Sequence, residues 1–214
     1  MRHEGDPMVK SSPSVVVFDL GKVLLDFDFR VFAEGLAQDA SVSADDVMEA
    51  IVQSSILVEY ESGRTSSSVF FEQVKNVTGY RGSYESFECL FGEIFTPLDE
   101  MIAAQERISM KGIPTYICSN TNEIAIRTIR RLFRFFDRFS GYVLSHEHQS
   151  MKPDSHIYRI TESVVGKSGA DLVFIDDKEE NISAAIARGW HGIVHVTPSE
   201  TLAALDRLGI LASE

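Results

Sequence analysis

The sequence is poor in cysteine and in long apolar runs. Its two cysteines, Cys89 and Cys118, lie far apart and lack the paired spacing of a structural zinc site or a disulfide framework. No apolar run approaches the ~18 residues that a membrane-spanning helix needs. Residues 1–13 lack the apolar core of a signal peptide, and we expect them to form a disordered tail. These absences favour a cytoplasmic protein that folds without disulfides or zinc.

Basic residues are also scarce relative to acidic ones. The chain carries 32 acidic and 20 basic side chains, which gives a formal charge of −12. A general nucleic-acid binder or an anionic-membrane binder normally has the opposite sign, so we expect neither partner. A small anionic ligand remains compatible, because its site needs only a few local cations. The 44% apolar content and the length of 214 residues suit one globular domain with a modest insertion.

Short apolar runs rich in β-branched and aromatic residues recur along the chain. Such runs are typical of strands buried in a parallel sheet. They occupy residues 15–18, 114–118, 142–144, 172–175 and 193–196. Helical patterns lie among them at residues 99–111, 122–135, 154–165 and 179–188. This alternation predicts right-handed βαβ units, and therefore an α/β fold with a doubly wound, Rossmann-like parallel sheet.

Residues 27–97 interrupt the alternation. They contain no convincing buried strand, and polar or glycine-containing turns separate their amphipathic stretches. These helical stretches lie near residues 30–40, 44–57, 66–77 and 84–95. We therefore predict that residues 27–97 form a small all-helical cap inserted after the first strand. Residues 14–26 and 98–214 would form the α/β core.

Polar side chains follow three of the predicted strands. They are Asp19, the pair Ser119 and Asn120, and the pair Asp176 and Asp177. Ligands of open α/β sheets bind at the carboxyl ends of the strands, so we expect these side chains to lie close together. Lys152 comes just before Pro153, a residue suited to the first turn of a helix, and would lie at that helix's positive end.

This set of side chains predicts a site for a metal and a phosphate. Carboxylates held together repel one another unless a cation joins them, and Mg²⁺ prefers oxygen ligands. Ser119, Asn120 and Lys152 are donors suited to phosphate oxygens. One carboxylate would then be free to attack the phosphate. Each residue alone also fits a turn, a helix cap or a solvated surface, so the hypothesis depends on their joint placement.

Four motifs resemble those of the haloacid dehalogenase-like (HAD) hydrolase superfamily. They are FDLGKVL at residues 18–24, ICSN at 117–120, MKPD at 151–154 and FIDDKEENI at 174–182. The insertion resembles the small helical cap of one subfamily, above all in YESGRTSSSVFF at residues 60–71. The resemblance covers nearly the whole chain from about residue 14. It implies a Mg²⁺-dependent phosphatase that acts on a small phosphorylated metabolite.

The resemblance also implies which residues would bind the metal. Asp19 would be the nucleophile that forms an aspartyl-phosphate, and it would bind Mg²⁺ together with the backbone carbonyl of Gly21. Asp177 would be the principal further metal ligand. Asp176 would contribute through water or as a support.

Other residues would bind the substrate. Ser119 and Lys152 would bind the phosphoryl group, and Lys152 would also hold the nucleophilic aspartate in its anionic form. Asn120 would assist with its backbone or its amide. In the cap, Glu61 and Arg64 flank a glycine in a turn that could face the substrate, although a charge pair at the start of a helix would look the same.

Gly21 departs from the family pattern. Most phosphatases of the superfamily carry a second Asp there, which protonates the leaving oxygen and then activates water. Loss of such help typically costs ~10²–10⁴ in rate. The string resembles a branch that includes sugar-1-phosphate phosphatases, which favours a sugar phosphate with a good leaving group. Asp26 and Asp28 are candidate replacements for the missing acid, although solvated carboxylates at a hinge would have the same pattern.

Two other functions fit part of the sequence. A 2-haloacid dehalogenase uses the same nucleophile without a metal and also lacks the second Asp, but Asp176 and Asp177 would then have no task. A non-catalytic binding protein would explain Gly21, but not the retention of the remaining polar residues. We interpret His146 and His148 as part of a solvated loop rather than a metal pair, and Cys118 as a buried thiol.

Overall fold

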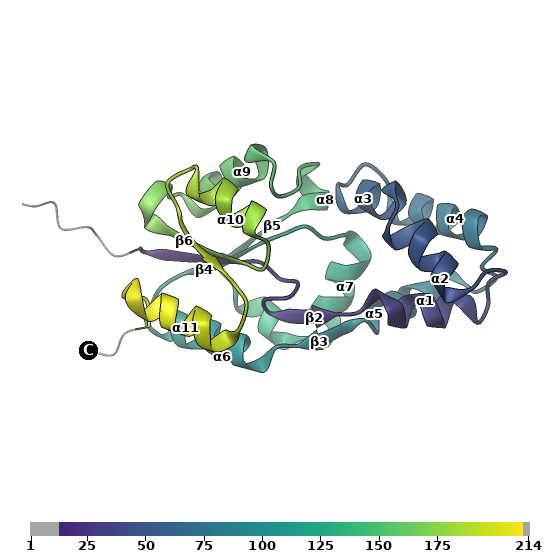
Figure 1. The fold of residues 1–214 in the computed structure, drawn as a ribbon, viewed down its shortest axis with the longest axis horizontal. Coiled ribbons are helices and arrows are strands. Elements are labelled where there is room, and N and C mark those ends of the chain that lie inside the picture. Colours follow the sequence, from purple (N-terminus) through teal and green to yellow (C-terminus); the bar gives the residue numbers. More distant parts are fainter. Residues whose placement is uncertain (1–12, 212–214) are drawn as a thin grey trace, which may run out of the picture.

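This computed structural model describes residues 13–211. The tail expected over residues 1–13 therefore lies almost entirely outside the described residues. The molecule has a sheet-containing core and a layer of helices beside it, which we call the cap (Figure 1). Among the described residues, none of the helices is both long and apolar enough to cross a bilayer.

The core is built on a five-stranded parallel sheet. Its strand order is β5-β4-β1-β6-β7, so the first strand lies at the centre. Val17 in β1 pairs with Tyr116 on one side and with Phe174 on the other. The strands are β1 (Val15–Phe18), β4 (Thr115–Ser119), β5 (Gly141–Leu144), β6 (Leu172–Asp176) and β7 (His191–Val194). The predicted α/β fold with a doubly wound parallel sheet is confirmed.

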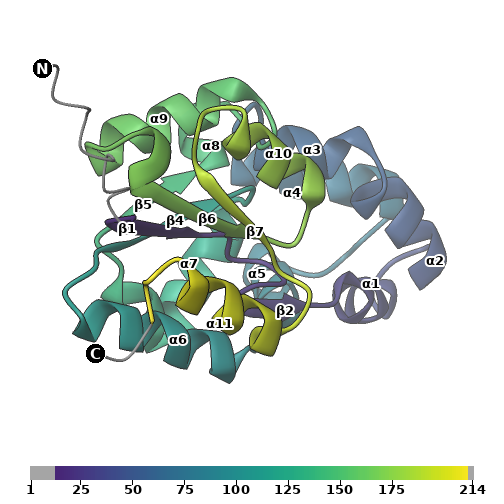
Figure 2. The same ribbon diagram turned by 60° about the vertical axis from the view of Figure 1, so that its left-hand side comes forward.

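Helices cover both faces of this sheet (Figure 2). Val15 and Val17 of β1 point to one face and pack in the cluster that contains residues of α9 and α10. Val16 and Phe18 point to the other face and pack with α6, α7 and α11. The helices are α6 (Asp99–Met110), α7 (Glu123–Leu132), α9 (Ser155–Val165), α10 (Glu179–Ile186) and α11 (Pro198–Arg207). Because both faces are covered, the strands are apolar on both sides.

Three core elements differ from the sequence-based expectation. Strand β7 runs from His191 to Val194 rather than over 193–196, because its pairing with β6 begins at His191 and ends where Asp176, the last residue of β6, pairs with Val194. Helix α11 was not predicted, although Thr197 caps it and a proline begins it. The segment expected as a loop around His146 is a short helix, α8 (Ser145–His148).

The cap is helical, as predicted, but one expected helix is broken. The stretch predicted as a helix over 44–57 contains α2 and a π-helical turn, and α3 begins only after Ser54, whose side chain accepts a hydrogen bond from Ile56 N. Buried rings fill the cap interior, including a stacked pair formed by Tyr60 and Phe70. The cap elements are α1 (Phe29–Ala37), α2 (Ala44–Val47), the π-turn Met48–Val52, α3 (Ser55–Glu61), α4 (Ser67–Thr78) and α5 (Tyr84–Gly92).

A two-stranded antiparallel ribbon joins the cap to the core. It pairs β2 (Leu25–Phe27) with β3 (Phe95–Pro97), where the sequence predicted helix ends and a hinge. Each strand has three residues and contains a residue poorly suited to strands, Asp26 or Pro97, so no apolar run marks it. Both chain crossings between core and cap pass through this ribbon, as Figure 1 shows.

The end of α3 is fixed against the core. Ser145 Oγ donates a hydrogen bond to the carbonyl of Glu61, and the Tyr60 hydroxyl accepts one from Ile124 N at 3.0 Å. Gly63 then turns the chain with a left-handed backbone (φ 69°), directly over the carbonyl of His146. A Cβ on Gly63 would lie 2.0 Å from that carbonyl oxygen, so only glycine fits this contact.

This contact predicts an unequal cost for two matched substitutions. Gly166 has the same φ of 69° but open space around its missing Cβ. Gly166→Ala should therefore cost only the left-handed backbone penalty, ~1–2 kcal/mol. Gly63→Ala should cost about 1–3 kcal/mol more, because it also forces α3 away from α8. Equal losses of unfolding free energy in urea would show that α3 does not depend on this contact.

Candidate active site

The polar residues that follow β1, β4 and β6 meet at one edge of the sheet. Asp19 follows β1, Ser119 ends β4 and Asp176 ends β6. Carboxylate oxygens of Asp19, Asp176 and Asp177 lie within 4.8 Å of one another. The parallel strands bring these residues together because all their carboxyl ends face the same way.

Lys152 lies between two of these carboxylates. Its Nζ is 2.8 Å from Asp19 Oδ1 and 2.6 Å from Asp176 Oδ2, and only 1% of its side chain is exposed. Its place differs from the expected helix start, because Asp154 rather than Lys152 precedes the first turn and caps α9. Pro153 therefore lies in the turn before the helix, and Lys152 is not part of the helix start.

Asn120 fixes the backbone of this lysine. Its Oδ1 accepts a hydrogen bond from Lys152 N at 2.7 Å, and its Nδ2 donates one to Lys152 O at 2.9 Å. Both ends of the amide are thus used on one residue. The structure therefore gives the Asn120 side chain a positioning contact, where the sequence suggested a contact with phosphate.

Asp176 is fully buried and has several partners. Asn181 Nδ2 donates to both of its oxygens, at 2.9 and 3.1 Å, and Lys178 N donates to Oδ1 at 2.9 Å. Tyr158 in turn donates its hydroxyl proton to the carbonyl of Asn181. Asp177 lies beside it with partial exposure and lines the open space in front of the site.

Burial dominates the electrostatics of this cluster. Burial raises the pKa of Asp19 to about 6, although Lys152 acts in the opposite direction. Burial also raises the pKa of Asp177 above its ordinary value, and the neighbouring Asp176 adds to the rise. For Lys152, burial lowers the pKa, but the two carboxylates more than offset this and hold it above the usual range. Lys152 thus brings one buried ammonium to a cluster of three carboxyl groups.

The donor set fits a hard divalent cation. Three carboxyl groups converge, but the one buried ammonium cannot balance them all, and a cation with oxygen ligands would supply the remaining positive charge. Cys118 lies buried beneath the site, where burial raises the pKa of its thiol to about 11. It is therefore neither a metal ligand nor a nucleophile at neutral pH, as the sequence suggested.

The space beside Gly21 is already filled. A Cβ on this residue would lie 2.7 Å from Cε1 of the Phe27 ring. Lys22 lies above that ring, with Nζ 4.6 Å from its centroid, and donates to Phe27 O at 3.0 Å. The ring therefore occupies the position that a side chain at residue 21 would need.

The two hinge carboxylates are engaged elsewhere. Asp26 is exposed and forms an ion pair with Lys22, whose hydrogen bond holds the pKa of Asp26 below its ordinary value. Asp28 caps α1 by accepting a hydrogen bond from Arg30 N. Neither lines the hollow in front of the nucleophile candidate. In this arrangement neither carboxylate is placed to replace the missing acid.

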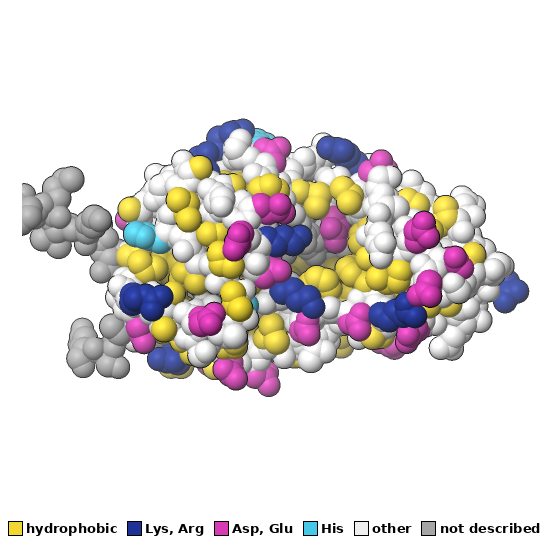
Figure 3. Space-filling model, in the orientation of Figure 1, with side chains coloured by type: hydrophobic (Ala, Val, Ile, Leu, Met, Phe, Trp, Pro, Cys, Tyr) yellow, Lys and Arg dark blue, Asp and Glu magenta, His cyan; other side chains and the backbone are white. Residues whose placement is uncertain are grey.

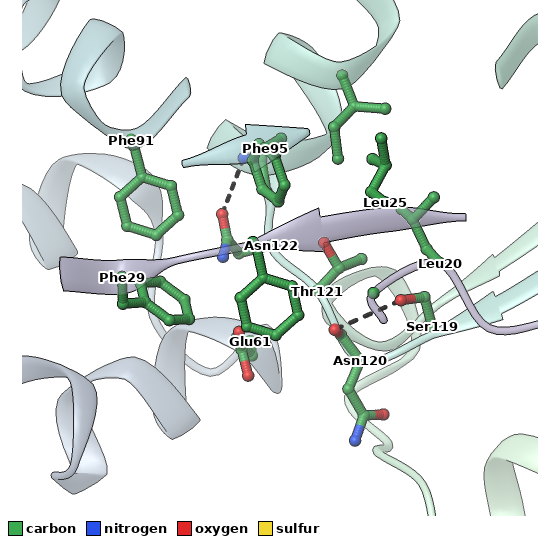
Figure 4. Close-up of a pocket in the computed structure, with 14 residues that line it drawn as sticks. Leu20, Leu25, Phe29, Glu61, Phe91, Phe95, Ser119, Asn120, Thr121 and Asn122 are labelled. Atoms are coloured by element: carbon green, nitrogen blue, oxygen red, sulfur yellow. Dashed lines mark hydrogen bonds between the residues drawn. The ribbon is translucent and has the colours of Figure 1, made fainter. Parts of the chain in front are cut away.

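Figure 3 shows a hollowed region between core and cap, and it divides into two adjoining hollows. One has both charged and apolar walls, and it includes Asp19, Lys152, Asp177 and Lys178. The other is mostly apolar. Its apolar walls are Leu20, Leu25, Phe27, Phe29, Phe91, Phe95, Ala125 and Ile129. Figure 4 shows the rings of Phe29, Phe91 and Phe95 gathered on one side, with Ser119 and Asn120 towards the core.

The two cap residues suggested by the sequence differ in placement. Glu61, the last residue of α3, lines both hollows. Arg64 is exposed and lines neither, because the left-handed turn at Gly63 carries the chain away. The aromatic lining was not foreseen, although Phe27 and Phe29 flank Asp28 directly after the first motif and could have been noticed as a pair.

The comparisons with known proteins show the family and the fold of the chain. The family model described as haloacid dehalogenase-like hydrolase matches residues 13–189. The chain belongs to the haloacid dehalogenase-like hydrolases. A sesquiterpene phosphatase of Aspergillus oryzae is 27% identical over 185 residues, covering 86% of this chain and 89% of that protein.

Solved structures of other HAD-like proteins share the fold. A HAD family enzyme of Bacteroides thetaiotaomicron, in complex with magnesium and inorganic phosphate, has a TM-score of 0.73 at 19% identity and covers 86% of this chain and 94% of its own. A HAD-like hydrolase of Porphyromonas gingivalis has a TM-score of 0.79 at 21% identity, covering 95% and 100%. The L-2-haloacid dehalogenase of Xanthobacter autotrophicus reaches 0.61 at 17% identity, covering 94% and 84%.

Proposed function

We propose that this HAD-like hydrolase is a Mg²⁺-dependent phosphatase that hydrolyses a small phosphate monoester through an aspartyl-phosphate on Asp19. The observation that carries the proposal is the convergence of Asp19, Asp176 and Asp177 within 4.8 Å, with Lys152 Nζ in contact with the first two. The relative named as a sesquiterpene phosphatase supports it. So does the fold shared with a HAD enzyme that was crystallised with magnesium and phosphate.

The metal would be held by oxygen ligands. Asp19 and Asp177 would bind Mg²⁺ directly, with the Gly21 carbonyl, and Asp176 would support the ion from behind. This ordering fits Asp176 having its oxygens already engaged by Lys152 and Asn181, whereas Asp177 is partly exposed. When bound, the ion would screen the carboxylates and polarise the phosphoryl group.

Two side chains would receive the phosphoryl oxygens. Ser119 Oγ has only a long contact, 3.5 Å, to a neighbouring carbonyl, so its proton is available to a ligand. Lys152 has three N–H donors and uses two on carboxylates, which leaves one for the phosphoryl group. Asn120 would keep Lys152 in place.

The apolar hollow indicates which kind of alcohol the substrate contains. The sequence favours a sugar phosphate, but sugar hydroxyls would find few partners among Leu20, Phe29, Phe91 and Phe95. An alcohol with an apolar chain would bury that chain there, with ~25 cal/mol gained per Å² of apolar surface removed from water. We therefore propose a phosphate monoester of an apolar alcohol in preference to a sugar phosphate.

A metal-free dehalogenase is less well supported, despite the shared fold. Without a cation, the one buried ammonium, Lys152, would have to balance three converging carboxyl groups, with the exposed Lys178 nearby. A binding protein without activity is also less well supported, because Asp19 keeps its contacts to Lys152 and to the backbone of Leu20.

A substrate panel with and without metal tests the proposal. We expect phosphate release from prenyl and alkyl monophosphates in Mg²⁺, slower release from glucose 1-phosphate, and none after EDTA treatment. Re-addition of Mg²⁺ should restore the rate. Release that is indifferent to EDTA, or halide release from 2-chloropropionate in EDTA, would contradict the proposal. Faster turnover of the sugar phosphate would contradict only the preference for an apolar alcohol.

A further inference from the structure

The active site needs a proton donor that the first motif does not supply. Gly21 has no side chain, and the Phe27 ring fills the space where one would lie. An alkyl alcohol is a poor leaving group unless its oxygen is protonated as the P–O bond breaks. The donor for this step must therefore come from another part of the molecule.

One carboxyl group in the described hollows has no role yet. Within residues 13–211, the carboxyl groups that line the two hollows belong to Asp19, Asp177 and Glu61. The first two are the proposed nucleophile and metal ligand. Glu61 comes from the cap, at the end of α3, and Figure 4 shows it between Phe29 and Asn120 in that view.

The backbone of Glu61 is held in place by the core. Ser145 Oγ donates to its carbonyl, the neighbouring Tyr60 hydroxyl accepts from Ile124 N, and Gly63 rests on the carbonyl of His146. The carboxyl group itself has no hydrogen-bond partner among the described residues and lies free in the hollow. A group fixed at its base and free at its tip is suited to exchange a proton with a ligand.

The surroundings of Glu61 favour its acid form more than water does. Burial raises its pKa to about 7, the negative charge of Asp19 raises it further, and Lys178 acts in the opposite direction. The other charged groups in the same hollow are Lys22, Lys152 and Asp177. The acid form of Glu61 is therefore populated near pH 7, where a general acid works best.

We propose that Glu61 is the general acid and base of the reaction, in place of the missing carboxylate at residue 21. The inference rests on the proposed phosphatase function. As Asp19 attacks phosphorus, the P–O bond to the alcohol breaks, and the leaving oxygen keeps the electron pair and takes the proton of Glu61. Glu61 is then a carboxylate. It removes a proton from the water that attacks the aspartyl-phosphate, which releases phosphate and restores the acid.

Two probe substrates separate this role from a structural one. Hexyl phosphate has a leaving group that needs protonation, whereas p-nitrophenyl phosphate has one that does not. We expect Glu61→Gln to lower kcat for hexyl phosphate ~10²–10⁴-fold. With p-nitrophenyl phosphate, the variant should release about one p-nitrophenolate per active site in a rapid burst, followed by slow turnover, because the phosphoenzyme forms but lacks its base.

The pH profile supplies an independent readout. For the wild type, kcat/KM with hexyl phosphate should fall as the pH rises past about 7, because Glu61 loses its proton. Glu61→Gln should lack this limb, and Glu61→Asp should retain it at a reduced rate. Glu59→Gln, on the same helix, is the matched control and should behave as the wild type. Thermal unfolding of each variant confirms that it is folded.

The outcomes separate the proposed role of Glu61 from the proposed phosphatase function. A wild type that hydrolyses both probes, with a Glu61→Gln variant that keeps the wild-type rate on hexyl phosphate, would overturn the role of Glu61 alone. Equal loss on both probes without a burst would also overturn it, because that is the result of a structural defect. A wild type inactive on both would instead contradict the proposed phosphatase function.

Discussion

Asp19→Asn is expected to lower phosphate release at least ~10³-fold, because an amide oxygen cannot form the aspartyl-phosphate. The substitution is nearly isosteric, and Lys152 Nζ keeps its 2.6 Å contact with Asp176. The variant should therefore fold like the wild type. The measurement is kcat on the best monoester of the panel in saturating Mg²⁺, with unfolding in urea as the check on folding.

The matched control for this substitution is Asp45→Asn. Asp45 lies on the cap surface with its side chain 81% exposed, and it pairs with Arg30. Its replacement should leave kcat and the midpoint of urea unfolding close to those of the wild type, because exposed ion pairs contribute little to stability. Turnover by Asp19→Asn at more than about a tenth of the wild-type rate would remove Asp19 as the nucleophile.

Lys152→Met is expected to cost both activity and stability. The ammonium is the buried partner of two carboxylates, and removing it leaves both without their ion pair in an enclosed site. Breaking a buried pair of this kind costs about 3–5 kcal/mol. The free energy of unfolding should fall by that amount when measured in EDTA, so that no added cation replaces the lost charge. Phosphate release should fall below detection.

An exposed lysine provides the comparison. Lys167 pairs with Asp171 at 3.9 Å, and 49% of its side chain is exposed, so Lys167→Met should cost less than about 1 kcal/mol. A Lys152→Met protein as stable as the Lys167→Met protein would show that the buried ammonium does not hold the site together.

The edge of the sheet could be predicted because each strand carries its own local pattern. Val15 to Phe18 form an uninterrupted apolar run that ends in Asp19, and the later strands repeat this arrangement. A parallel sheet then requires that the strand ends meet, whatever the connections between them. The sequence thus indicated which residues gather, and the structure brings Asp19, Asp176 and Asp177 together.

Features built from distant segments could not be predicted in this way. The apolar hollow combines Phe27 and Phe29, at the start of the insertion, with Phe91 and Phe95, near its end. The strands β2 and β3 have three residues each, which is too short to show the alternation of apolar and polar residues that marks a strand. The sequence around Asn120 and Lys152 likewise does not indicate the two hydrogen bonds by which Asn120 holds the backbone of Lys152.

Glu61 shows why the cap was the hardest part to assign. Its pattern, a glutamate before a glycine turn, fits equally a helix end or a contact with the substrate. The position of Glu61 depends on the turn at Gly63, which packs against the carbonyl of His146. That carbonyl belongs to α8, a segment that the sequence predicted as a loop. Arg64, which looked equivalent, points to solvent for the same reason.

The most direct test is a crystal structure of the protein with Mg²⁺ and beryllium trifluoride, which mimics a phosphoryl group on a carboxylate. We predict beryllium bonded to an Asp19 oxygen, fluorines in contact with Ser119 Oγ and Lys152 Nζ, and Mg²⁺ bound by both Asp19 and Asp177. Beryllium trifluoride bound away from Asp19, or a magnesium ion out of reach of Asp177, would contradict the account.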